Sequence, residues 1–290
     1  MQSILIIGCG DIALRAAALL RGRYRLFGLV RNSAHHAVLR AAGIVPVSGD
    51  LDRRDSLSRI AGLAHAVLHL APPANAGESD IRTRNLLAAL SRGSLPQRLV
   101  YISTSGVYGD CGGAEVDETR VLAPQSSRAQ RRVDAERRTR NWAQHNGVHA
   151  SILRVPGIYA EQRLPLERLR AGTPAICAHE DSHTNHIHAD DLARTLVAAL
   201  RHGKPNRVYH ASDDSELKMG DYFDAVADAF ALPRPLRLPR AEVERAVSPT
   251  LWSFMNESRK LTNTRMKREL KVVLHHPTVQ HALAEITSRC

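Results

Sequence analysis

The chain has few aromatic residues and few lysines. Phe, Trp and Tyr make up 4% of its 290 residues, so a core must be built mainly from Ala, Leu, Val and Ile. Lysine occurs only five times, first at Lys204, and nearly all of the positive charge is therefore arginine. The net charge of +11 would permit binding to a polyanion, but the basic residues are scattered, without a basic tail or interleaved aromatics. This distribution argues against nucleic-acid binding.

Paired cysteines and long apolar runs are also missing. Cys9, Cys111, Cys177 and Cys290 show neither disulfide nor zinc-site spacing, and unrelated thiols are typical of a reducing compartment. No apolar run reaches the roughly 18 residues that a membrane-spanning helix needs. The apolar N-terminus lacks a basic region and leads into a glycine turn, which indicates a buried strand rather than a signal peptide. We therefore expect a cytoplasmic protein.

What the first 155 residues do contain is an alternation of short apolar runs and longer amphipathic stretches. This pattern predicts a parallel sheet with crossover helices. Several runs are nearly continuous Val, Ile and Leu, as expected of strands buried on both faces. The predicted strands are 3–7, 25–30, 44–48, 66–70, 98–102 and 150–154, and the main helices are 12–20, 80–91 and 128–145. The sequence thus predicts an α/β fold of the Rossmann type, a doubly wound parallel sheet.

The pattern changes after Pro156. Residues 156–183 predict a loop-rich insertion, and 184–210 predict a strand–helix–strand unit that returns to the sheet. Residues 211–290 are basic and mostly helical, and we expect them to form a small lid over the substrate. The dinucleotide-binding core would then be residues 1–155, with an intertwined boundary to the lid.

A glycine-rich turn follows the first predicted strand. Residues 8–13, Gly-Cys-Gly-Asp-Ile-Ala, match the Gly-x-Gly-x-x-Gly fingerprint of dinucleotide sites, with alanine at the third small position. Gly8 would supply the tight turn, and Gly10 would let backbone N–H groups approach a pyrophosphate at the helix N-terminus. The strand before and the helix after give the motif its correct context. We expect a bound dinucleotide, with Asp11 and Ile12 also in the cofactor-binding turn.

The end of the second strand indicates which dinucleotide is bound. An NAD site places Asp or Glu about 20 residues after the fingerprint, to accept a hydrogen bond from the ribose 2′-hydroxyl. Here the strand ends at Arg31, and no acidic residue follows until Asp50. A guanidinium group suits a 2′-phosphate, so NADP is favoured over NAD. The alternative is that Arg31 is a solvated residue after the strand.

Residues 101–109, Tyr-Ile-Ser-Thr-Ser-Gly-Val-Tyr-Gly, resemble the segment that carries the catalytic Ser or Thr in extended short-chain dehydrogenases. That family includes the NAD(P)-dependent nucleotide-sugar epimerases and dehydratases. The resemblance covers most of the chain, from Gly8 to Leu270, and implies that Thr104 is the catalytic hydroxyl. It also implies cofactor contacts by Asp50, Leu51, Leu70, Ala71 and Pro72.

The family's catalytic Tyr-x-x-x-Lys pair is missing, so the chain resembles an atypical member. At the corresponding helix positions it has Arg128 and Arg132, and no Tyr lies between residues 108 and 159. Arginine stays protonated and cannot exchange the proton that the family's tyrosine exchanges. Two guanidinium groups beside Thr104 would instead bind an anionic substrate. The alternative is that both belong to a solvated basic helix face.

Catalysis would then require another acid or base. Tyr108, next to the strand end, is the first substitute, and Tyr159 follows a segment similar to one near the cofactor in the family. His186 and His188 alternate within the histidine-rich stretch 179–191, where neutral imidazoles suggest metal ligands. The same stretch resembles the family segment that returns from the substrate loop to the sheet. We therefore predict no metal, and substrate contacts by Tyr159 and His186.

These features predict an NAD(P)-binding oxidoreductase or epimerase-like enzyme, with NADP favoured, that acts on a small polar or anionic substrate at a non-standard acid/base site. The alternative is a non-catalytic NADP(H)-sensing regulatory protein, which the loss of Tyr and Lys favours. The retained Thr104 and substrate-loop segments favour the enzyme. The oligomeric state stays open, because an arginine-rich helix would occupy the family's usual dimer face.

Overall fold

A seven-stranded parallel sheet lies at the centre of the computed structural model, which describes residues 1–288. Cys290 lies outside the described residues. The strand order is β12-β7-β5-β4-β1-β2-β3, so the direction of winding reverses between β1 and β4, where open α/β sheets bind their ligands. The strands are β1 (Ser3–Ile7), β2 (Arg25–Val30), β3 (Ile44–Ser48), β4 (Ala66–His69), β5 (Arg98–Thr104), β7 (His149–Val155) and β12 (Arg207–His210).

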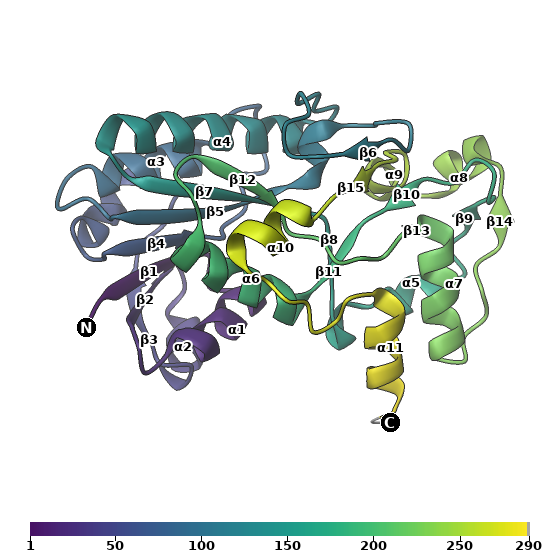
Figure 1. Ribbon diagram of the computed structural model, residues 1–290, viewed down its shortest axis with the longest axis horizontal. Coiled ribbons are helices and arrows are strands. Elements are labelled where there is room, and N and C mark those ends of the chain that lie inside the picture. The colour runs from purple at the N-terminus through teal and green to yellow at the C-terminus, as the bar shows by residue number, and fades with distance from the viewer. Residues whose placement is uncertain (289–290) are drawn as a thin grey trace.

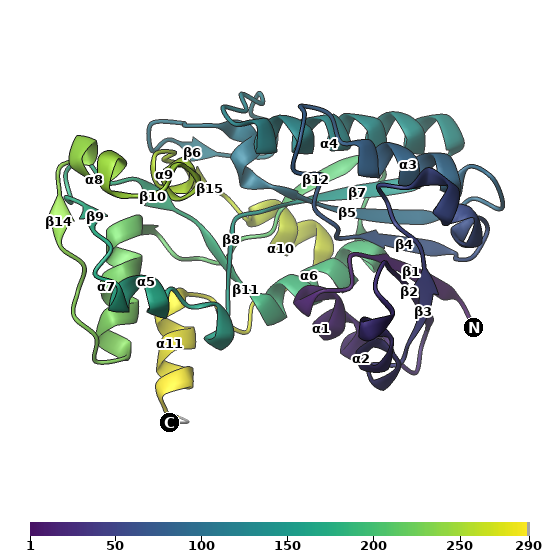
Figure 2. The ribbon, with the colours of Figure 1, turned by 180° about the vertical axis from the view of Figure 1, so that it is seen from behind.

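Helices cover both faces of the sheet (Figures 1 and 2). Alternate residues of β1 enter different clusters: Ile4 and Ile6 pack with α1 and α6, whereas Leu5 and Ile7 pack with α3 and α4. The helices are α1 (Asp11–Leu20), α2 (His36–Ala41), α3 (Ile81–Leu90), α4 (Ser127–Asn146) and α6 (Ala189–His202), with the 3₁₀ turns η1 (Ser33–His35), η2 (Arg54–Ile60) and η3 (Ser105–Tyr108). Complete burial of β1 explains its unbroken apolar sequence.

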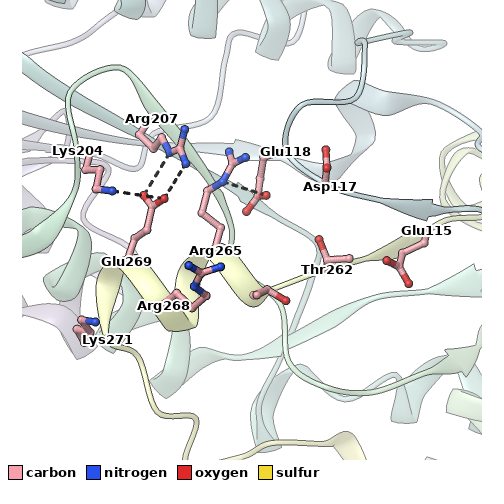
Figure 3. A pocket seen from close by; sticks show the side chains of 11 residues that line it. Glu115, Asp117, Glu118, Lys204, Arg207, Thr262, Arg265, Arg268, Glu269 and Lys271 are labelled. Atoms are coloured by element: carbon pink, nitrogen blue, oxygen red, sulfur yellow. Dashed lines mark hydrogen bonds and ion pairs between the residues drawn. The ribbon is translucent and has the colours of Figure 1, made fainter.

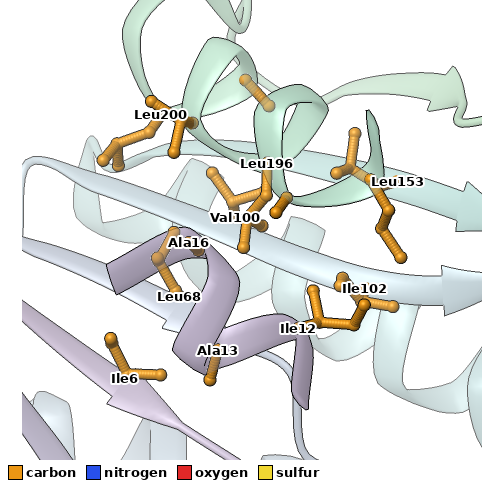
Figure 4. Packing of buried hydrophobic residues seen from close by; sticks show 14 of the residues in the cluster. Ile6, Ile12, Ala13, Ala16, Leu68, Val100, Ile102, Leu153, Leu196 and Leu200 are labelled. Carbon is orange, nitrogen blue, oxygen red and sulfur yellow. The ribbon is translucent and has the colours of Figure 1, made fainter. Parts of the chain in front are cut away.

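Small residues let α1 approach the sheet and α6 closely. Ala13 and Ala16 face the sheet beside Ile6 and Leu68, as Figure 4 shows. Ala13 is 1% exposed, so the third small position of the glycine fingerprint serves helix–strand packing. This packing fixes where the N-terminus of α1 points.

A smaller lobe extends from the carboxyl end of the sheet (Figure 1). It is built from short two-stranded pairs and short helices around an apolar cluster that contains Tyr159, Phe223 and Leu283. The paired strands are β6 (Glu115–Val116) with β15 (Lys260–Leu261), β8 (Gly157–Tyr159) with β11 (His186–His188), β9 (Ala175–Ile176) with β14 (Arg237–Leu238), and β10 (His183–Thr184) with β13 (Leu217–Lys218). Its helices are η4 (Glu161–Arg163), α5 (Leu166–Arg170), α7 (Met219–Ala229), α8 (Arg240–Ala246), α9 (Pro249–Met255) and α11 (Val279–Thr287), while α10 (Thr264–Leu270) packs on α6.

The predicted Rossmann-type fold is confirmed. The first three strands have the predicted bounds, the fourth ends one residue early at His69, and β5 extends two residues further, to Thr104. The insertion 156–183 contains more regular structure than its loop-rich composition predicted, because β8 and β9 each pair with a later strand. Within residues 1–288, no helix has the length and hydrophobicity needed to cross a membrane.

Candidate functional site

The turn between β1 and α1 has the form of a pyrophosphate cradle. Gly8 has φ +94°, and a Cβ there would stand 2.5 Å from the backbone nitrogen of Ala71 and 2.8 Å from the carbonyl carbon of Leu70. Glycine alone fits this conformation and close approach. Gly10 is the N-cap of α1, has no side-chain cap in the described chain, and faces open space: a Cβ there would meet nothing within 4 Å. The first N–H groups of α1 are thus accessible to an anion, and the residues fit a dinucleotide.

A cavity of about 300 Å³ opens beside this turn, at the carboxyl ends of β1 and β2. It is formed where the winding of the sheet reverses, the usual place for a nucleotide. Asn85, from α3, donates a hydrogen bond to the carbonyl of Leu51 and so holds the cavity wall in place. The predicted cofactor residues that line the cavity are Gly8, Arg31, Asp50, Leu51, Ala71 and Pro72.

Two arginines stand at this cavity. Arg31 is largely exposed, with 66% of its side chain accessible, and its nearest ion-pair partner is Asp52 at 3.9 Å. Asp52 makes a closer bidentate pair with Arg82, both contacts being 2.7 Å. Hydrogen bonds from Arg82 hold the pKa of Asp52 below its usual range. Arg31 therefore keeps most of its hydrogen-bonding capacity for a ligand, whereas Arg82, which the sequence did not single out, is largely committed to Asp52.

Asp11 and Ile12 do not line this cavity. Ile12 is buried in the core, and the Asp11 carboxylate accepts hydrogen bonds from Arg15 at 2.8 Å and from Arg163 at 3.0 Å. Arg15 also pairs with Asp190, so it is not free to bind a 2′-phosphate. Arg163 lies in η4, and its pair with Asp11 ties the insertion to the first turn of α1. The side chains of Asp11, Arg15 and Arg163 therefore join elements around the glycine turn, while the backbone N–H groups of Asp11 and Ile12 belong to the first turn of α1.

A second cavity, of about 450 Å³, lies at the end of β5 and contains Thr104. The Thr104 hydroxyl accepts a hydrogen bond from the backbone N–H of Gly106 at 3.3 Å and so caps η3. Its proton remains available for a ligand. The other walls of the cavity come mainly from the insertion and the C-terminal part of the chain: Arg163, Arg168, His183, His186, Tyr222, Phe223, Phe254, Glu257 and Arg259.

Arg128 and Arg132 do not act as a pair. Arg128 lines the Thr104 cavity, with its guanidinium carbon 3.9 Å from the centre of the Phe254 ring. Arg132 turns toward the sheet and donates to the hydroxyl of Tyr101 at 3.1 Å and the carbonyl of Ile102 at 2.8 Å. Positions four apart share a helix face, but these long side chains end in different places. The prediction that both residues form one anion site is therefore wrong, because Arg132 is hydrogen-bonded to β5.

Arg168, and not Arg132, lines the cavity together with Arg128. Its guanidinium carbon lies 3.9 Å from the centre of the Phe223 ring, and burial lowers its pKa to about 10. Across residues 1–288, neither Arg128 nor Arg168 has a carboxylate within 4.0 Å. By contrast, Arg259 pairs with Glu257 at 2.8 Å. The cavity thus holds two cations without a directly paired carboxylate, although Glu257 acts on Arg128 at longer range, and this arrangement favours an anionic ligand.

Tyr108 lies outside the Thr104 cavity, in a buried polar network. Its hydroxyl is 2.6 Å from both Arg154 Nη1 and His210 Nε2, and it is 3.3 Å from the carbonyl of Asp117. Burial raises its pKa to about 12. The side chain is 1% exposed, so it cannot reach a ligand beside Thr104. These contacts give Tyr108 a structural position and remove it from the candidates for acid/base catalysis.

Tyr159 and His186 lie close together but differ in access. Tyr159 is 1% exposed and does not line the cavity; burial, with the Asp213 carboxyl nearby, raises its pKa. His186 does line the cavity and stacks on Tyr222 with ring centres 4.2 Å apart. Burial lowers the pKa of His186 to about 3, so its ring is neutral near pH 7. His186 can therefore contact a ligand in the cavity, whereas Tyr159 cannot.

Glu257 is a cavity residue that sequence reasoning missed. A Cβ placed on Gly106 would lie 3.7 Å from Thr104 Oγ1 and 3.9 Å from Glu257 Oε2, so both oxygens flank the same glycine. The Glu257 carboxylate is largely buried and accepts hydrogen bonds from both terminal nitrogens of Arg259 at 2.8 Å. Glu257 follows α9, far from Thr104 in the chain, and no local motif marks it.

A third hollow, of about 850 Å³, lies among β6, β12 and α10 and shares no lining residue with the two cavities above (Figure 3). Its charged side chains largely neutralise one another. Glu269 pairs with Arg207 at 2.7 Å and Lys204 at 3.6 Å, and Glu118 pairs with Arg265 at 3.4 Å. This pairing distinguishes it from the Thr104 cavity, where Arg128 and Arg168 have no carboxylate within 4.0 Å in the described chain.

Two relatives are similar to most or all of this chain, one in sequence and the other in structure. An uncharacterized protein of Schizosaccharomyces pombe is 25% identical over 228 residues, which are 74% of this chain and 75% of that protein. A functionally unknown conserved protein from Silicibacter pomeroyi, a solved structure, is 28% identical, with a TM-score of 0.82 over 100% of this chain and 99% of its own. Neither relative carries a known activity.

Enzymes of known activity share the fold. The dTDP-glucose 4,6-dehydratase DesIV of Streptomyces venezuelae, solved as a double mutant with NAD and DAU bound, is 20% identical, with a TM-score of 0.79 over 99% of this chain and 96% of its own. The family model for the NAD dependent epimerase/dehydratase family matches residues 12–212, more than half of the chain. The protein is therefore a member of the NAD-dependent epimerase/dehydratase family.

Proposed function

We propose that this protein is an NADP-dependent enzyme of the epimerase/dehydratase class that acts on a small anionic substrate. The supporting observation is the Thr104 cavity with Arg128 and Arg168, whose guanidinium groups stack on aromatic rings and have no carboxylate within 4.0 Å in the described chain. Removing a cation from water without a counter-charge is unfavourable. A carboxylate or phosphate of the substrate would supply that counter-charge.

The turn after β1 would hold the cofactor. Gly8 and Gly10 would bring its pyrophosphate to the N-terminus of α1, and Arg31 would pair with the 2′-phosphate. Bound NADP would supply hydride transfer. Asp50 and Leu51 line the neighbouring cavity and would contact the adenosine part.

Thr104 and Glu257 would take over the proton transfer that a Tyr-Lys pair performs in typical members. Oxidation of a substrate alcohol releases a hydride from carbon and a proton from oxygen. The Thr104 hydroxyl would donate a hydrogen bond to the reacting oxygen of the substrate. The Glu257 carboxylate, held in place by Arg259, would accept the proton that leaves this oxygen. His186, neutral and at the cavity wall, would contact the substrate.

A non-catalytic NADP(H) sensor is the second candidate. It is favoured by one observation: no tyrosine of the chain has a lysine four residues later. In a sensor, the Thr104 cavity would bind a signalling anion without turnover, and the C-terminal lobe would report on the cofactor.

The cofactor proposal is tested by titrating the purified protein with NADPH and NADH and following nucleotide fluorescence. We expect NADPH to bind more tightly than NADH. Arg31→Ala should weaken NADPH binding by about tenfold or more, which is one charge-assisted contact, and leave NADH binding nearly unchanged. Arg40→Ala, an exposed arginine outside the cavity, is the matched control. Equal losses for both nucleotides in Arg31→Ala would refute the NADP preference.

The catalytic proposal is tested with NADP⁺ and a panel of phosphorylated and carboxylated sugars and hydroxy acids. Thr104→Val and Glu257→Gln should lower turnover by about 100-fold or more and keep NADPH affinity. Glu161→Gln, an exposed carboxylate in η4, is the control. If a substrate is turned over equally well by wild type and both variants, the assigned acid/base site is wrong. If the anions bind and none is turned over, the sensor is favoured.

A further inference from the structure

We infer a binding site for a divalent transition-metal ion, with zinc the best-suited ion, at His188, Asp190 and His276, outside the cofactor and substrate cavities. Three parts of the chain meet there: His188 ends β11, Asp190 stands in the first turn of α6, and His276 lies between α10 and α11 (Figure 1). The site does not depend on the proposed enzymatic activity.

The spacing of the three side chains suits a single ion. One ligand atom from each residue lies within 4.8 Å of the other two. The rings of His188 and His276 are 3.8 Å apart between centres, and Asp190 Oδ2 is 3.8 Å from His188 Nδ1. Ligand atoms about 2 Å from a tetrahedral zinc ion stand roughly 3.3 Å from one another. An ion bound at His188 Nδ1 would take the place of the N–H of Asp190, which Nδ1 now accepts at 3.3 Å, and side-chain rotations would bring the other two ligands into coordination.

Neighbouring hydrogen bonds hold these ligands in place. The Asp191 carboxylate is fully buried and accepts the backbone N–H groups of His275 at 2.9 Å and His276 at 2.8 Å, which fixes the segment against α6. Arg15 binds Oδ1 of Asp190, while Oδ2 is the oxygen nearest His188 Nδ1. Outer contacts of this kind orient metal ligands and tune their affinity. Two of the ligands are thus preorganised by residues that do not touch the ion.

Helix α11 extends the cluster toward solvent. His281 and Glu285 are four apart and share a helix face; with His276 they form a second group whose ligand atoms all lie within 4.8 Å. The inner group is more buried, since 8% of the His188 side chain and 15% of that of His276 are accessible, against 46% for His281. We assign the ion to the inner group, with His281 or water as the fourth ligand and the α11 face as the entry path.

A bound ion would fasten α11 and the segment before it to the core through α6 and β11. His186, two residues before His188, lines the substrate cavity. The ion would therefore also stiffen one wall of that cavity. Its direct consequence is stability, because an ion that binds the folded state alone raises the free energy of unfolding.

The test is calorimetric titration of the full chain, freed of any affinity tag and stripped with EDTA, with zinc chloride. We expect one ion per chain and a higher unfolding temperature with zinc than with EDTA. His276→Ala should weaken zinc binding by about 100-fold or more and abolish the thermal shift. His188→Asn, which retains an oxygen able to cap the N–H of Asp190, should also weaken binding. Circular dichroism of both metal-free variants shows whether they fold.

The control is His179→Ala, which removes an exposed histidine from a different group, Cys177, His179 and Glu180. It should bind zinc as wild type does. The inference is overturned if wild type takes up no stoichiometric zinc, or if binding persists in folded His276→Ala. Loss of zinc binding in His179→Ala would place the ion at the Cys177 group and would also overturn it. Cobalt(II) in place of zinc should give the intense visible absorption of a four-coordinate site.

Discussion

At the residue scale, the clearest effect of the fold is on side chains that titrate. Asp213 is 5% exposed, and burial raises its pKa to about 7. One carboxyl oxygen accepts the N–H of Ser215 at 2.9 Å, and the other has no hydrogen bond of standard geometry within residues 1–288, although the Tyr159 hydroxyl is near. The backbone N–H of Asp213 donates to the carbonyl of His186, which lines the Thr104 cavity, so this acid lies directly behind a wall of that cavity.

Asp213→Asn should therefore change how stability depends on pH. The folded-state pKa of about 7 lies above the unfolded value, so between pH 4 and 7 the folded protein holds a proton that the unfolded chain has released. Wild type must lose stability relative to the variant as pH rises through this range, by up to about 4 kcal/mol. Urea unfolding at several pH values between 5 and 8 measures the difference. A difference that stays constant with pH would contradict the assignment.

At the scale of elements, the turn between β1 and α1 contains two glycines, Gly8 and Gly10, that are needed for different reasons. Gly8 is required by the chain itself, because the backbone of Leu70 and Ala71 occupies the space of a Cβ. Gly10 faces open space, so its lack of a side chain matters only to a ligand. The fingerprint predicted both tasks, and the structure shows that the fold itself requires a glycine at position 8 and not at position 10.

This separation predicts opposite phenotypes for two alanine substitutions. Gly8→Ala should destabilise the fold by about 3 kcal/mol or more, because φ is +94° and the new Cβ overlaps backbone atoms. Gly10→Ala should leave unfolding within about 1 kcal/mol of wild type and weaken NADPH binding. Urea unfolding and nucleotide titration measure the two effects. Normal stability of Gly8→Ala, or normal nucleotide binding by Gly10→Ala, would show that the cradle is wrongly assigned.

A buried ion pair joins helix α4 to strand β7. Arg154 and Glu136 are bidentate, with contacts of 3.1 and 2.7 Å, and 4% and 3% of their side chains are accessible. The Arg154 guanidinium also reaches Tyr108. The pair therefore positions the network that begins directly after β5.

Glu136→Gln should destabilise the protein by about 3–5 kcal/mol, since it leaves a buried guanidinium without its counter-charge. Arg137→Gln on the same helix removes an ion pair with Asp134 from a side chain that is 69% exposed, and should cost less than about 1 kcal/mol. Chemical denaturation compares the two variants. Similar losses in both would mean that burial does not determine the strength of these pairs.

At the scale of the whole molecule, four buried histidines resist protonation. Burial lowers the pKa of His69, His186 and His210 to about 3 and that of His188 to about 4. They belong to different parts of the structure, since His69 ends β4, His210 ends β12, and the other two lie in β11. Their titration therefore reports on the core and the smaller lobe together.

Stability should fall as pH decreases below about 6.5, because the unfolded histidines then bind protons that the folded ones do not. Asp213 acts in the opposite direction, and the expected net loss between pH 7.5 and 5.5 is on the order of 3 kcal/mol. Urea unfolding monitored by circular dichroism measures it. In Asp213→Asn the loss should be larger. Stability that is flat or rises over this interval would show that these histidines are not buried in the neutral form.

The fold could be predicted well from local patterns, and the site only in part. Near-continuous apolar runs identified the central strands, and the glycine turn marked the place where the winding of the sheet reverses and a cavity opens. Arg128 and Arg132 show where this failed: both guanidinium groups were predicted to lie beside Thr104, but the carbonyl of Ile102 in β5 binds Arg132, and Arg128 alone of the two lines the cavity. Arg168, Glu257 and His276 carried no local signal, because Phe223, Thr104 and His188, the residues that they meet, lie more than 50 residues away in the chain.

The sequence by itself determined the parallel sheet, the glycine turn after β1 and the position of Thr104 at the end of β5. These depend on hydrophobic periodicity and on the conformational freedom of glycine, which act over a few neighbouring residues. Only the tertiary structure decided which arginines have no carboxylate within 4.0 Å in the described chain, which carboxylate lies near Thr104, and which histidines meet near α11. Those outcomes depend on burial and on contacts between distant segments, and burial sets the charge of a side chain as strongly as its own chemistry does.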